Sequence, residues 1–202
     1  MFELPEAISS KQHEFSLAEG PILIIGAAYT GKSELAQRVM NANATATVIG
    51  TGDLEDDDFN KRIQLLKDGR PPLWESIEGQ ENLLTQLNAA TSHTNQIIID
   101  SVNQWLANMT LSLAKKYDPE QLEELLLHEG RQLCGIIREY RDSKRIALVS
   151  SEVGAGITPP SSLARVYRQV TSRINCYLAE ECRTVIMVSA GIPMVLKGRQ
   201  LS

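Results

Sequence analysis

The chain of 202 residues has few cysteines, few aromatic side chains and no surplus of basic charge. Its three cysteines are odd in number and form no pair with metal-ligand spacing, so we predict a reduced, cytoplasmic setting. The net charge of −5 leaves no excess of lysine and arginine to neutralise the phosphates of a nucleic acid. We therefore expect no nucleic-acid partner.

Long apolar runs are also lacking. No apolar stretch approaches the roughly 20 residues that a membrane-spanning helix needs, so we expect no membrane span. The first residues, MFELPEAISSKQHEF, lack a basic region followed by an apolar one, which is not the pattern of a signal peptide. A hydrophobic share of 43% suffices for one buried core. We predict one nucleotide-binding domain over residues 1–202, with residues 1–18 as an N-terminal extension.

Short apolar runs rich in β-branched residues alternate with helical patterns along the chain. This alternation is typical of an α/β fold with a mainly parallel sheet and helices on both of its faces. The predicted strands are Pro21–Gly26, Thr45–Gly50, Gln96–Asp100, Arg145–Ser151 and Thr184–Ala190, with a further short strand at Leu73–Glu78.

Two long helices are marked by start signals and by apolar residues at helical spacing. Asp118 followed by Pro119 combines a capping residue with a proline at the first helical position. Ser161 or Ser162, after a pair of prolines, can cap the second helix. We interpret both apolar stripes as faces that pack on the sheet.

The most specific motif is GAAYTGKS at residues 26–33, which satisfies the P-loop pattern G-x-x-x-x-G-K-[ST]. Its glycines let the backbone wrap closely, so that successive N–H groups point at phosphate oxygens. Lys32 reaches the β- and γ-phosphates as a catalytic residue, and the hydroxyl of Ser33 ligates Mg²⁺. The predicted site for a nucleoside triphosphate comprises Gly26, Ala27, Ala28, Tyr29, Thr30, Gly31, Lys32 and Ser33.

Asp100 ends a predicted strand, at the position where P-loop enzymes hold or orient Mg²⁺. We predict that Asp100 is catalytic and shares the metal with Ser33. The alternative is that Asp100 caps the helix that follows.

Further motifs follow the P-loop in order. They are DDDFNKRIQLLKDGRPPLWESIE at 56–78, IIIDSVNQWLANM at 97–109, VSSEVGAGITPPSSLARVYRQV at 149–170 and AGIP at 190–193. Together with the P-loop, these blocks resemble the bifunctional adenosylcobinamide kinase/adenosylcobinamide-phosphate guanylyltransferase family of cobalamin biosynthesis. The resemblance spans about residues 21–197, and its most specific parts are R-I-x-x-x-K-D-G-R-P at 62–71 and E-V-G-x-G-I at 152–157.

This resemblance implies a RecA-like P-loop fold, a homotrimer and two reactions. In the first, ATP or GTP phosphorylates the hydroxyl on the aminopropanol arm of adenosylcobinamide, which is a corrinoid. In the second, GTP donates GMP to the new phosphate. The nucleotide-binding residues that the resemblance adds to the P-loop are Thr51, Gly52, Asp53, Leu66, Lys67, Asp68, Gly69, Glu78 and Asp100.

The sequence departs from the family pattern at two places. Leu65 occupies the position of the guanylylated histidine, and a leucine has no nucleophilic nitrogen to carry GMP. Tyr29 and Thr30 stand where the family usually has arginine and serine, which removes a cation from the P-loop. The remaining histidines, expected to be ordinary surface or packing residues, are His13, His93 and His128.

These departures leave three hypotheses open. Phosphoryl transfer depends mainly on positioning and charge stabilisation, so a kinase activity can survive without the histidine while covalent guanylyl transfer is lost. Alternatively, the protein is a catalytically silent nucleotide-binding relative with a regulatory or scaffolding role. A third hypothesis is direct, non-covalent transfer of GMP.

A few other residues have two interpretations. Glu152 either orients a substrate or ribose group or only shapes a turn. Lys67 and Arg70 either contact phosphates or are solvated loop charges. We interpret Trp74 and Trp105 as packing residues rather than as platforms for a corrin ring.

Overall fold

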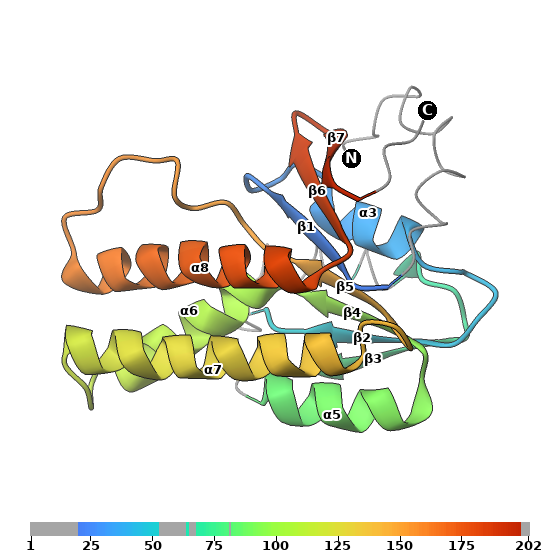
Figure 1. Cartoon of the computed structure of the whole chain (residues 1–202), viewed down its shortest axis with the longest axis horizontal. Coiled ribbons are helices and arrows are strands. Elements are labelled where there is room, and N and C mark those ends of the chain that lie inside the picture. Colours follow the sequence, from blue (N-terminus) through green and yellow to red (C-terminus); the bar gives the residue numbers. More distant parts are fainter. Residues whose placement is uncertain (1–19, 53–63, 65–67, 81, 199–202) are drawn as a thin grey trace.

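A seven-stranded sheet forms the centre of the computed structural model, which describes residues 20–52, 64, 68–80 and 82–198 (Figure 1). The strands are β1 Ile22–Gly26, β2 Ala46–Gly50, β3 Trp74–Glu78, β4 Gln96–Asp100, β5 Arg145–Val149, β6 Thr184–Ser189 and β7 Ile192–Lys197. They lie in the order β3-β2-β4-β5-β1-β6-β7, and all are parallel except β7, which runs antiparallel to β6. The helices are α3 Lys32–Arg38, α5 Leu83–His93, α6 Val102–Leu113, α7 Pro119–Glu139 and α8 Ser162–Glu181.

Alternate residues of the strands belong to two separate cores on opposite faces of the sheet. In β4, Ile97 and Ile99 join the larger core, to which α5, α6, α7 and α8 also contribute. Ile98 between them joins the smaller core together with Leu35 of α3. The predicted α/β fold with helices on both faces is thereby confirmed, and strands buried on both faces explain the nearly continuous apolar runs.

The six predicted strands are all present, with ends that lie within two residues of the expected bounds. Strand β7 was not predicted, because it contains Pro193 and alternates between half-buried and exposed residues. Ile192 and Leu196 of this strand are more than half exposed. An edge strand tolerates both features because one of its sides needs no hydrogen-bonding partner.

The predicted helix starts are confirmed in both long helices. Oδ1 of Asp118 accepts hydrogen bonds from the backbone N–H groups of Glu120 and Gln121 at 3.0 and 2.9 Å, within a capping box. The second helix is capped by Ser161 rather than Ser162, with Oγ 3.4 Å from the N of Ala164. Helices α7 and α8 lie side by side against the larger core, as their stripes indicated (Figure 1).

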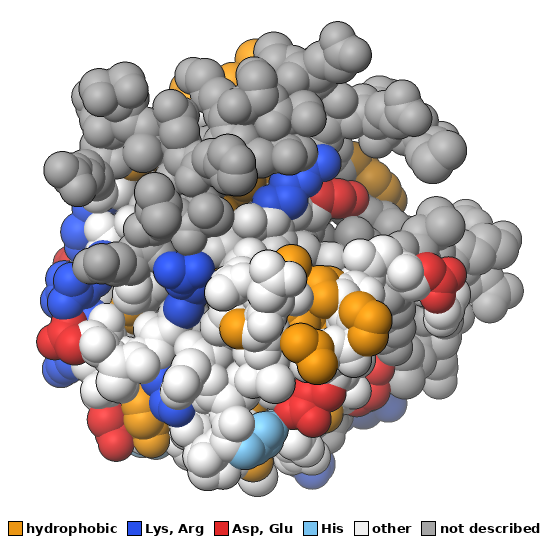
Figure 2. Space-filling model, turned by 90° about the vertical axis from the view of Figure 1, so that its right-hand side faces the viewer, with side chains coloured by type: hydrophobic (Ala, Val, Ile, Leu, Met, Phe, Trp, Pro, Cys, Tyr) orange, Lys and Arg blue, Asp and Glu red, His pale blue; other side chains and the backbone are white. Residues whose placement is uncertain are grey.

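The surface carries charges of both signs. On the face shown in Figure 2, basic and acidic side chains are interspersed, and a small group of hydrophobic side chains lies among them. In the described part of the chain, none of the helices combines the length and the apolarity that crossing a membrane requires.

Candidate nucleotide-binding site

The P-loop connects the end of β1 to the start of α3, and two of its glycines adopt conformations that other residues rarely take. Gly26 has a φ of +151°, and a Cβ atom there would lie 2.2 Å from the carbonyl oxygen of Val188 in β6. Gly31 has a φ of +89° and is the N-cap residue of α3. These glycines therefore allow the tight turn that the motif predicted.

Lys32 lies inside this loop rather than in solvent. Only 7% of the residue is exposed, and its Nζ atom donates a hydrogen bond of 2.6 Å to the carbonyl oxygen of Ala27. The ammonium group is thus held among the backbone atoms that are expected to surround the phosphates.

Ser33 and Asp100 meet across the intervening strand β5. The Oγ atom of Ser33 donates a hydrogen bond of 3.2 Å to Oδ1 of Asp100. Asp100 does not cap the next helix, because the N-cap residue of α6 is Ser101. The cap interpretation of Asp100 is therefore not supported by the geometry.

The two oxygens of this pair are hard donors of the kind that Mg²⁺ prefers, so the residues present fit the predicted metal. Within the described ranges, the structure contains no cluster of three or more His, Cys, Asp or Glu side chains suited to holding a metal ion. Mg²⁺ at nucleotide sites is usually bound by one or two protein carboxylates together with substrate phosphates, and such a site needs no larger cluster.

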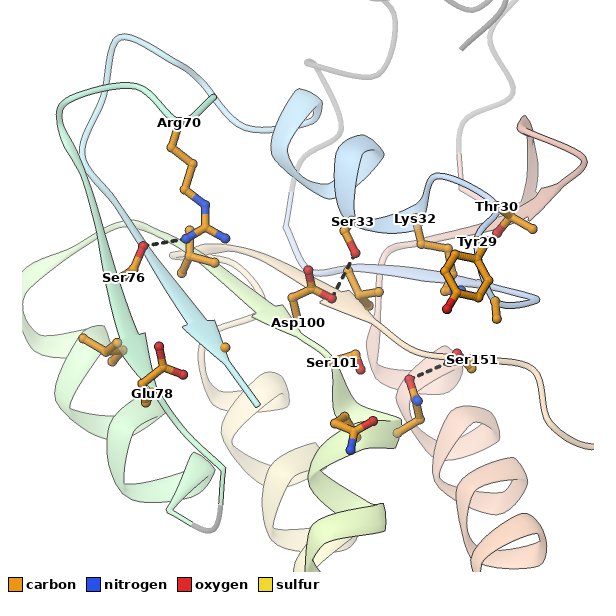
Figure 3. A pocket seen from close by; sticks show the side chains of 17 residues that line it. Tyr29, Thr30, Lys32, Ser33, Arg70, Ser76, Glu78, Asp100, Ser101 and Ser151 are labelled. Atoms are coloured by element: carbon orange, nitrogen blue, oxygen red, sulfur yellow. Dashed lines mark hydrogen bonds between the residues drawn. The ribbon is translucent and has the colours of Figure 1, made fainter. Parts of the chain in front are cut away.

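The parallel register aligns the carboxyl ends of four strands. Glu78 of β3 pairs with Gly50 of β2, which pairs with Asp100 of β4, and Asp100 pairs with Val149 of β5. All four residues line one cavity together with Lys32 and other P-loop residues (Figure 3). Because Gly50 has no side chain, β2 places no side chain between the carboxylates of Glu78 and Asp100 at this end of the sheet.

Arg70 reaches into the same cavity from the segment that precedes β3 (Figure 3). Its Nη1 atom donates a hydrogen bond to Oγ of Ser76. Burial lowers the pKa of the Arg70 guanidinium, whereas the carboxylates of Asp100 and Glu78 act in the opposite direction. A half-buried cation therefore faces the two carboxylates at the sheet edge.

Thr51 and Gly52 follow β2 but do not line the cavity. The Oγ1 atom of Thr51 donates to the carbonyl oxygen of Ser101 at 2.6 Å and accepts from its N–H at 2.8 Å. The N–H of Thr51 donates to the carbonyl oxygen of Asp100 at 3.0 Å. Thr51 thus fixes the backbone around Asp100, while the carbonyl oxygen of Gly52 accepts a 3.0 Å hydrogen bond from Gln80.

The other predicted nucleotide-binding residues lie outside this cavity or outside the residues that the structure describes. Asp68 accepts a 2.6 Å hydrogen bond from Gln64 and is exposed. Gly69 lines a separate hollow beside α3. The predicted residues Asp53, Leu66 and Lys67 fall outside the described ranges, and so does Leu65, the predicted counterpart of the family's histidine.

Residues 22–196 match the family model described as cobinamide kinase / cobinamide phosphate guanyltransferase. The chain belongs to this family. It is 32% identical over 180 residues to a relative from Salmonella typhimurium, the "bifunctional adenosylcobalamin biosynthesis protein CobU", with 87% of this chain and 99% of the relative covered. It is also 32% identical over 183 residues to the corresponding protein CobP of Pseudomonas aeruginosa, with 89% and 98% covered.

Solved structures support the fold of this cobinamide kinase/guanyltransferase family member. A protein from Pyrococcus horikoshii superposes with a TM-score of 0.51 at 12% identity, covering 95% of this chain and 93% of that one. An ATPase of a bacterial type III secretion system superposes with a TM-score of 0.52 at 11% identity, covering 88% and 54%. The RecA-like P-loop fold that the resemblance implied is confirmed.

The cavity of this family member contains polar residues that sequence reasoning did not single out. Asn103 on α6 accepts, through Oδ1, a 2.9 Å hydrogen bond from the backbone N of Ser151 after β5. Asn103 and Ser151 lie within three residues of the ends of β4 and β5, whose carboxyl ends meet at one edge, and that position was an available signal. The lining residues for which no phosphate or nucleotide contact was considered are Val48, Gly50, Ser76, Ile77, Ser101, Asn103, Gln104, Val149 and Ser151.

Neither histidine in the described residues lines this cavity. His93 ends α5, and its Nε2 atom lies 2.6 Å from Oε1 of Glu75, near the amino end of β3. This is the sheet edge opposite the P-loop, as predicted. His128 is exposed on α7, and His13 lies outside the described residues.

The geometry bears on two other open interpretations, those of Glu152 and of the two tryptophans. The Oε1 atom of Glu152 accepts a 2.8 Å hydrogen bond from the N of Gly154, which fits the turn-shaping interpretation, while a role in orienting a substrate or ribose group stays a prediction. Trp105 is 1% exposed in the larger core. Trp74 packs against the smaller core and donates a 3.1 Å hydrogen bond to the carbonyl oxygen of Ala44. The packing interpretation of both tryptophans is confirmed.

Proposed function

We propose that this chain is an adenosylcobinamide kinase that uses ATP or GTP as phosphoryl donor. The observation that carries the proposal is the hydrogen bond between Ser33 and Asp100 in the cavity that also contains Lys32. Membership of the cobinamide kinase/guanyltransferase family supports a corrinoid acceptor.

In the proposed reaction, the hydroxyl oxygen on the aminopropanol arm of the acceptor forms a bond to the γ-phosphorus. The bond between that phosphorus and the β–γ bridging oxygen breaks, the hydroxyl proton leaves to solvent, and a nucleoside diphosphate departs. Lys32 neutralises charge on the β- and γ-phosphates. Ser33 and Asp100 would hold Mg²⁺, which supplies further neutralisation of phosphate charge when it is bound.

We further propose that covalent guanylyl transfer is lost, because Leu65 stands at the position of the family's histidine. Both His93 and His128 lie outside the cavity, so neither is a substitute within the described residues. Incubation with α-labelled GTP tests this part. No acid-labile label should appear on the protein, and a Leu65→His variant should acquire one.

The kinase proposal is tested by incubating the whole protein with Mg-ATP or Mg-GTP and adenosylcobinamide, followed by chromatography and mass spectrometry of the corrinoid. We expect adenosylcobinamide phosphate, and its formation should be lost in Lys32→Ala. If neither nucleotide gives a phosphorylated corrinoid, the proposal is wrong. Tight nucleotide binding without turnover would then favour the silent, regulatory relative, an alternative motivated by Tyr29 in place of the P-loop arginine.

The oligomer is also a proposal. The family resemblance implies a homotrimer, so light scattering coupled to gel filtration should give a mass near three times the 22.3 kDa of the chain. A monomeric mass at micromolar concentration would contradict it.

A further inference from the structure

The Arg70 side chain is the one cation of the cavity lining that does not come from the P-loop, within the part of the chain that the structure describes. Figure 3 shows its guanidinium on the opposite side of Asp100 from Lys32. The hydrogen bond to Ser76 of β3 directs the guanidinium inward. A ligand in this cavity would therefore lie between a P-loop lysine and an arginine from a different segment.

The guanidinium retains unused hydrogen-bonding capacity. Its Nε atom is buried and has no hydrogen-bond acceptor among the described residues. An arginine presents several N–H groups in a planar fork, and among the described residues the Nη1 donation to Ser76 is the one hydrogen bond observed. Because leaving a buried donor without an acceptor is costly, such a group is well suited to bind a ligand oxygen.

A divalent metal ion on Asp100 would give the lining an excess of positive charge, which favours an anionic ligand. Lys32 and Arg70 balance Glu78 and Asp100, so these four side chains together carry no net charge. A metal ion on Asp100 would engage one of the two carboxylates that face Arg70. The guanidinium would then be available for phosphate oxygens, which match its fork geometry.

We propose that Arg70 binds the terminal phosphate of the nucleoside triphosphate and stabilises the charge on that group during transfer. This proposal rests on the kinase function proposed above. The transfer itself is the bond exchange already described, and Arg70 neither gains nor loses a proton in it.

The test compares binding of a non-hydrolysable triphosphate analogue with binding of the corresponding diphosphate, by calorimetry, in the whole protein. In Arg70→Gln, we expect triphosphate affinity to fall about 10- to 100-fold, the range of a hydrogen bond to a charged group. Diphosphate affinity should change by less than about threefold, because the terminal phosphate is absent. The turnover number for phosphoryl transfer should fall about 100- to 1,000-fold.

Two further variants sharpen the comparison. Arg131→Gln removes the same charge from an exposed position on α7 and should leave both affinities unchanged. Arg70→Lys keeps a cation but not the fork, and we expect an intermediate triphosphate-to-diphosphate ratio. If Arg70→Gln fails to fold, as judged by circular dichroism, this lysine variant carries the test.

Equal losses of triphosphate and diphosphate affinity would overturn the proposal, since they would show that Arg70 only maintains the shape of the cavity. Unchanged affinities would overturn it as well. The ratio of triphosphate to diphosphate affinity is measured without any corrinoid, so it does not depend on the kinase reaction. A wild-type protein that forms no phosphorylated product would therefore disprove the kinase function without deciding whether Arg70 contacts the terminal phosphate.

Discussion

The hydroxyl of Ser33 lies 3.2 Å from Oδ1 of Asp100 and donates a hydrogen bond to it, which joins the first turn of α3 to the carboxyl end of β4. These residues are 67 positions apart in the chain. Their side chains form one oxygen-rich unit, so changes at either position should have coupled rather than independent effects.

We expect Ser33→Ala and Asp100→Asn each to weaken Mg²⁺-dependent binding of a triphosphate by about 10- to 100-fold, and the double variant to lose less than the product of both factors. Calorimetry over a range of Mg²⁺ concentrations measures this effect. With EDTA present, the wild type should bind the triphosphate more weakly than it does with Mg²⁺. Under this condition Asp100→Asn should bind no more weakly than the wild type, because without the metal the Asp100 carboxylate repels phosphate.

Asp142→Asn is the matched control, because Asp142 is an exposed carboxylate that pairs with Arg183 outside the site. A loss of affinity in Asp100→Asn that is the same with and without Mg²⁺ would contradict the assignment of this pair to the metal.

Two glycines of α7 should respond in opposite directions to alanine. A Cβ atom at Gly130 would lie 2.2 and 2.5 Å from Cδ1 and Cγ1 of the fully buried Ile174, whereas a Cβ at Gly135 meets no atom within 4 Å. Gly130→Ala should lower the free energy of unfolding by about 1–3 kcal/mol through overpacking. Gly135→Ala should raise it by about 0.5–1 kcal/mol through helix propensity.

Urea denaturation of both variants beside the wild type gives these two differences. Stabilisation by Gly130→Ala would mean that α7 and α8 are less closely packed than the contact with Ile174 indicates.

The three thiols should differ sharply in reactivity. Burial raises the pKa of Cys134 to about 11 and that of Cys182 to about 12, while Cys176 is exposed. At pH 8 only about one in a thousand Cys134 thiols is ionised, and fewer still at Cys182. Ellman's reagent should therefore titrate one thiol in the native protein and three in guanidinium chloride.

Cys176→Ser should abolish the fast reaction phase of the native protein with Ellman's reagent. It should also lower the number of thiols titrated in guanidinium chloride from three to two. A fast phase that survives this substitution would show that α7 or α8 opens readily in the native state.

The ion pair between Arg138 of α7 and Glu181 of α8 should make stability depend on pH. The hydrogen bond from Arg138 lowers the pKa of Glu181, so the contribution of the pair is present above the ordinary glutamate pKa of about 4.3 and is lost as the pH falls through the lowered value. Glu181→Gln should cost about 1 kcal/mol near pH 7, a modest value because Arg138 is 69% exposed and water screens the pair.

The difference between Glu181→Gln and the wild type in melting experiments should stay constant from pH 7 to about 5 and shrink as the pH falls below the ordinary glutamate pKa of about 4.3. Glu180→Gln, at the exposed neighbouring position, should show no such trend. A difference that grows on acidification would contradict the sign of the pKa change.

Much of this fold could be predicted because burial on both faces of the sheet leaves continuous β-branched runs such as that of Ile97–Ile99. Strand β7 could not be predicted in the same way. Its exposed side and its proline weaken the strand pattern, and the strand depends on pairing with β6, which is a tertiary effect.

The site was predictable to the extent that its residues follow a local pattern. Lys32 and Ser33 belong to a short motif, and Asp100 ends an obvious strand. The position of Arg70 in the cavity depends on how the segment before β3 is placed, so the sequence left it either as a phosphate contact or as a solvated loop charge. Ser76 was missed because an isolated serine in a strand carries no chemical signal.

The position of Gly26 affects how a saturation-mutagenesis experiment on this protein should be interpreted. The main-chain oxygen of Val188 already occupies the place that any β-carbon at this residue would need. Depletion of every variant at Gly26 would therefore measure whether the chain can assemble β1 beside β6, even in a selection that does not require nucleotide. Phosphate recognition would be reported instead by positions such as Ala28, where side-chain size can be varied without this backbone conflict.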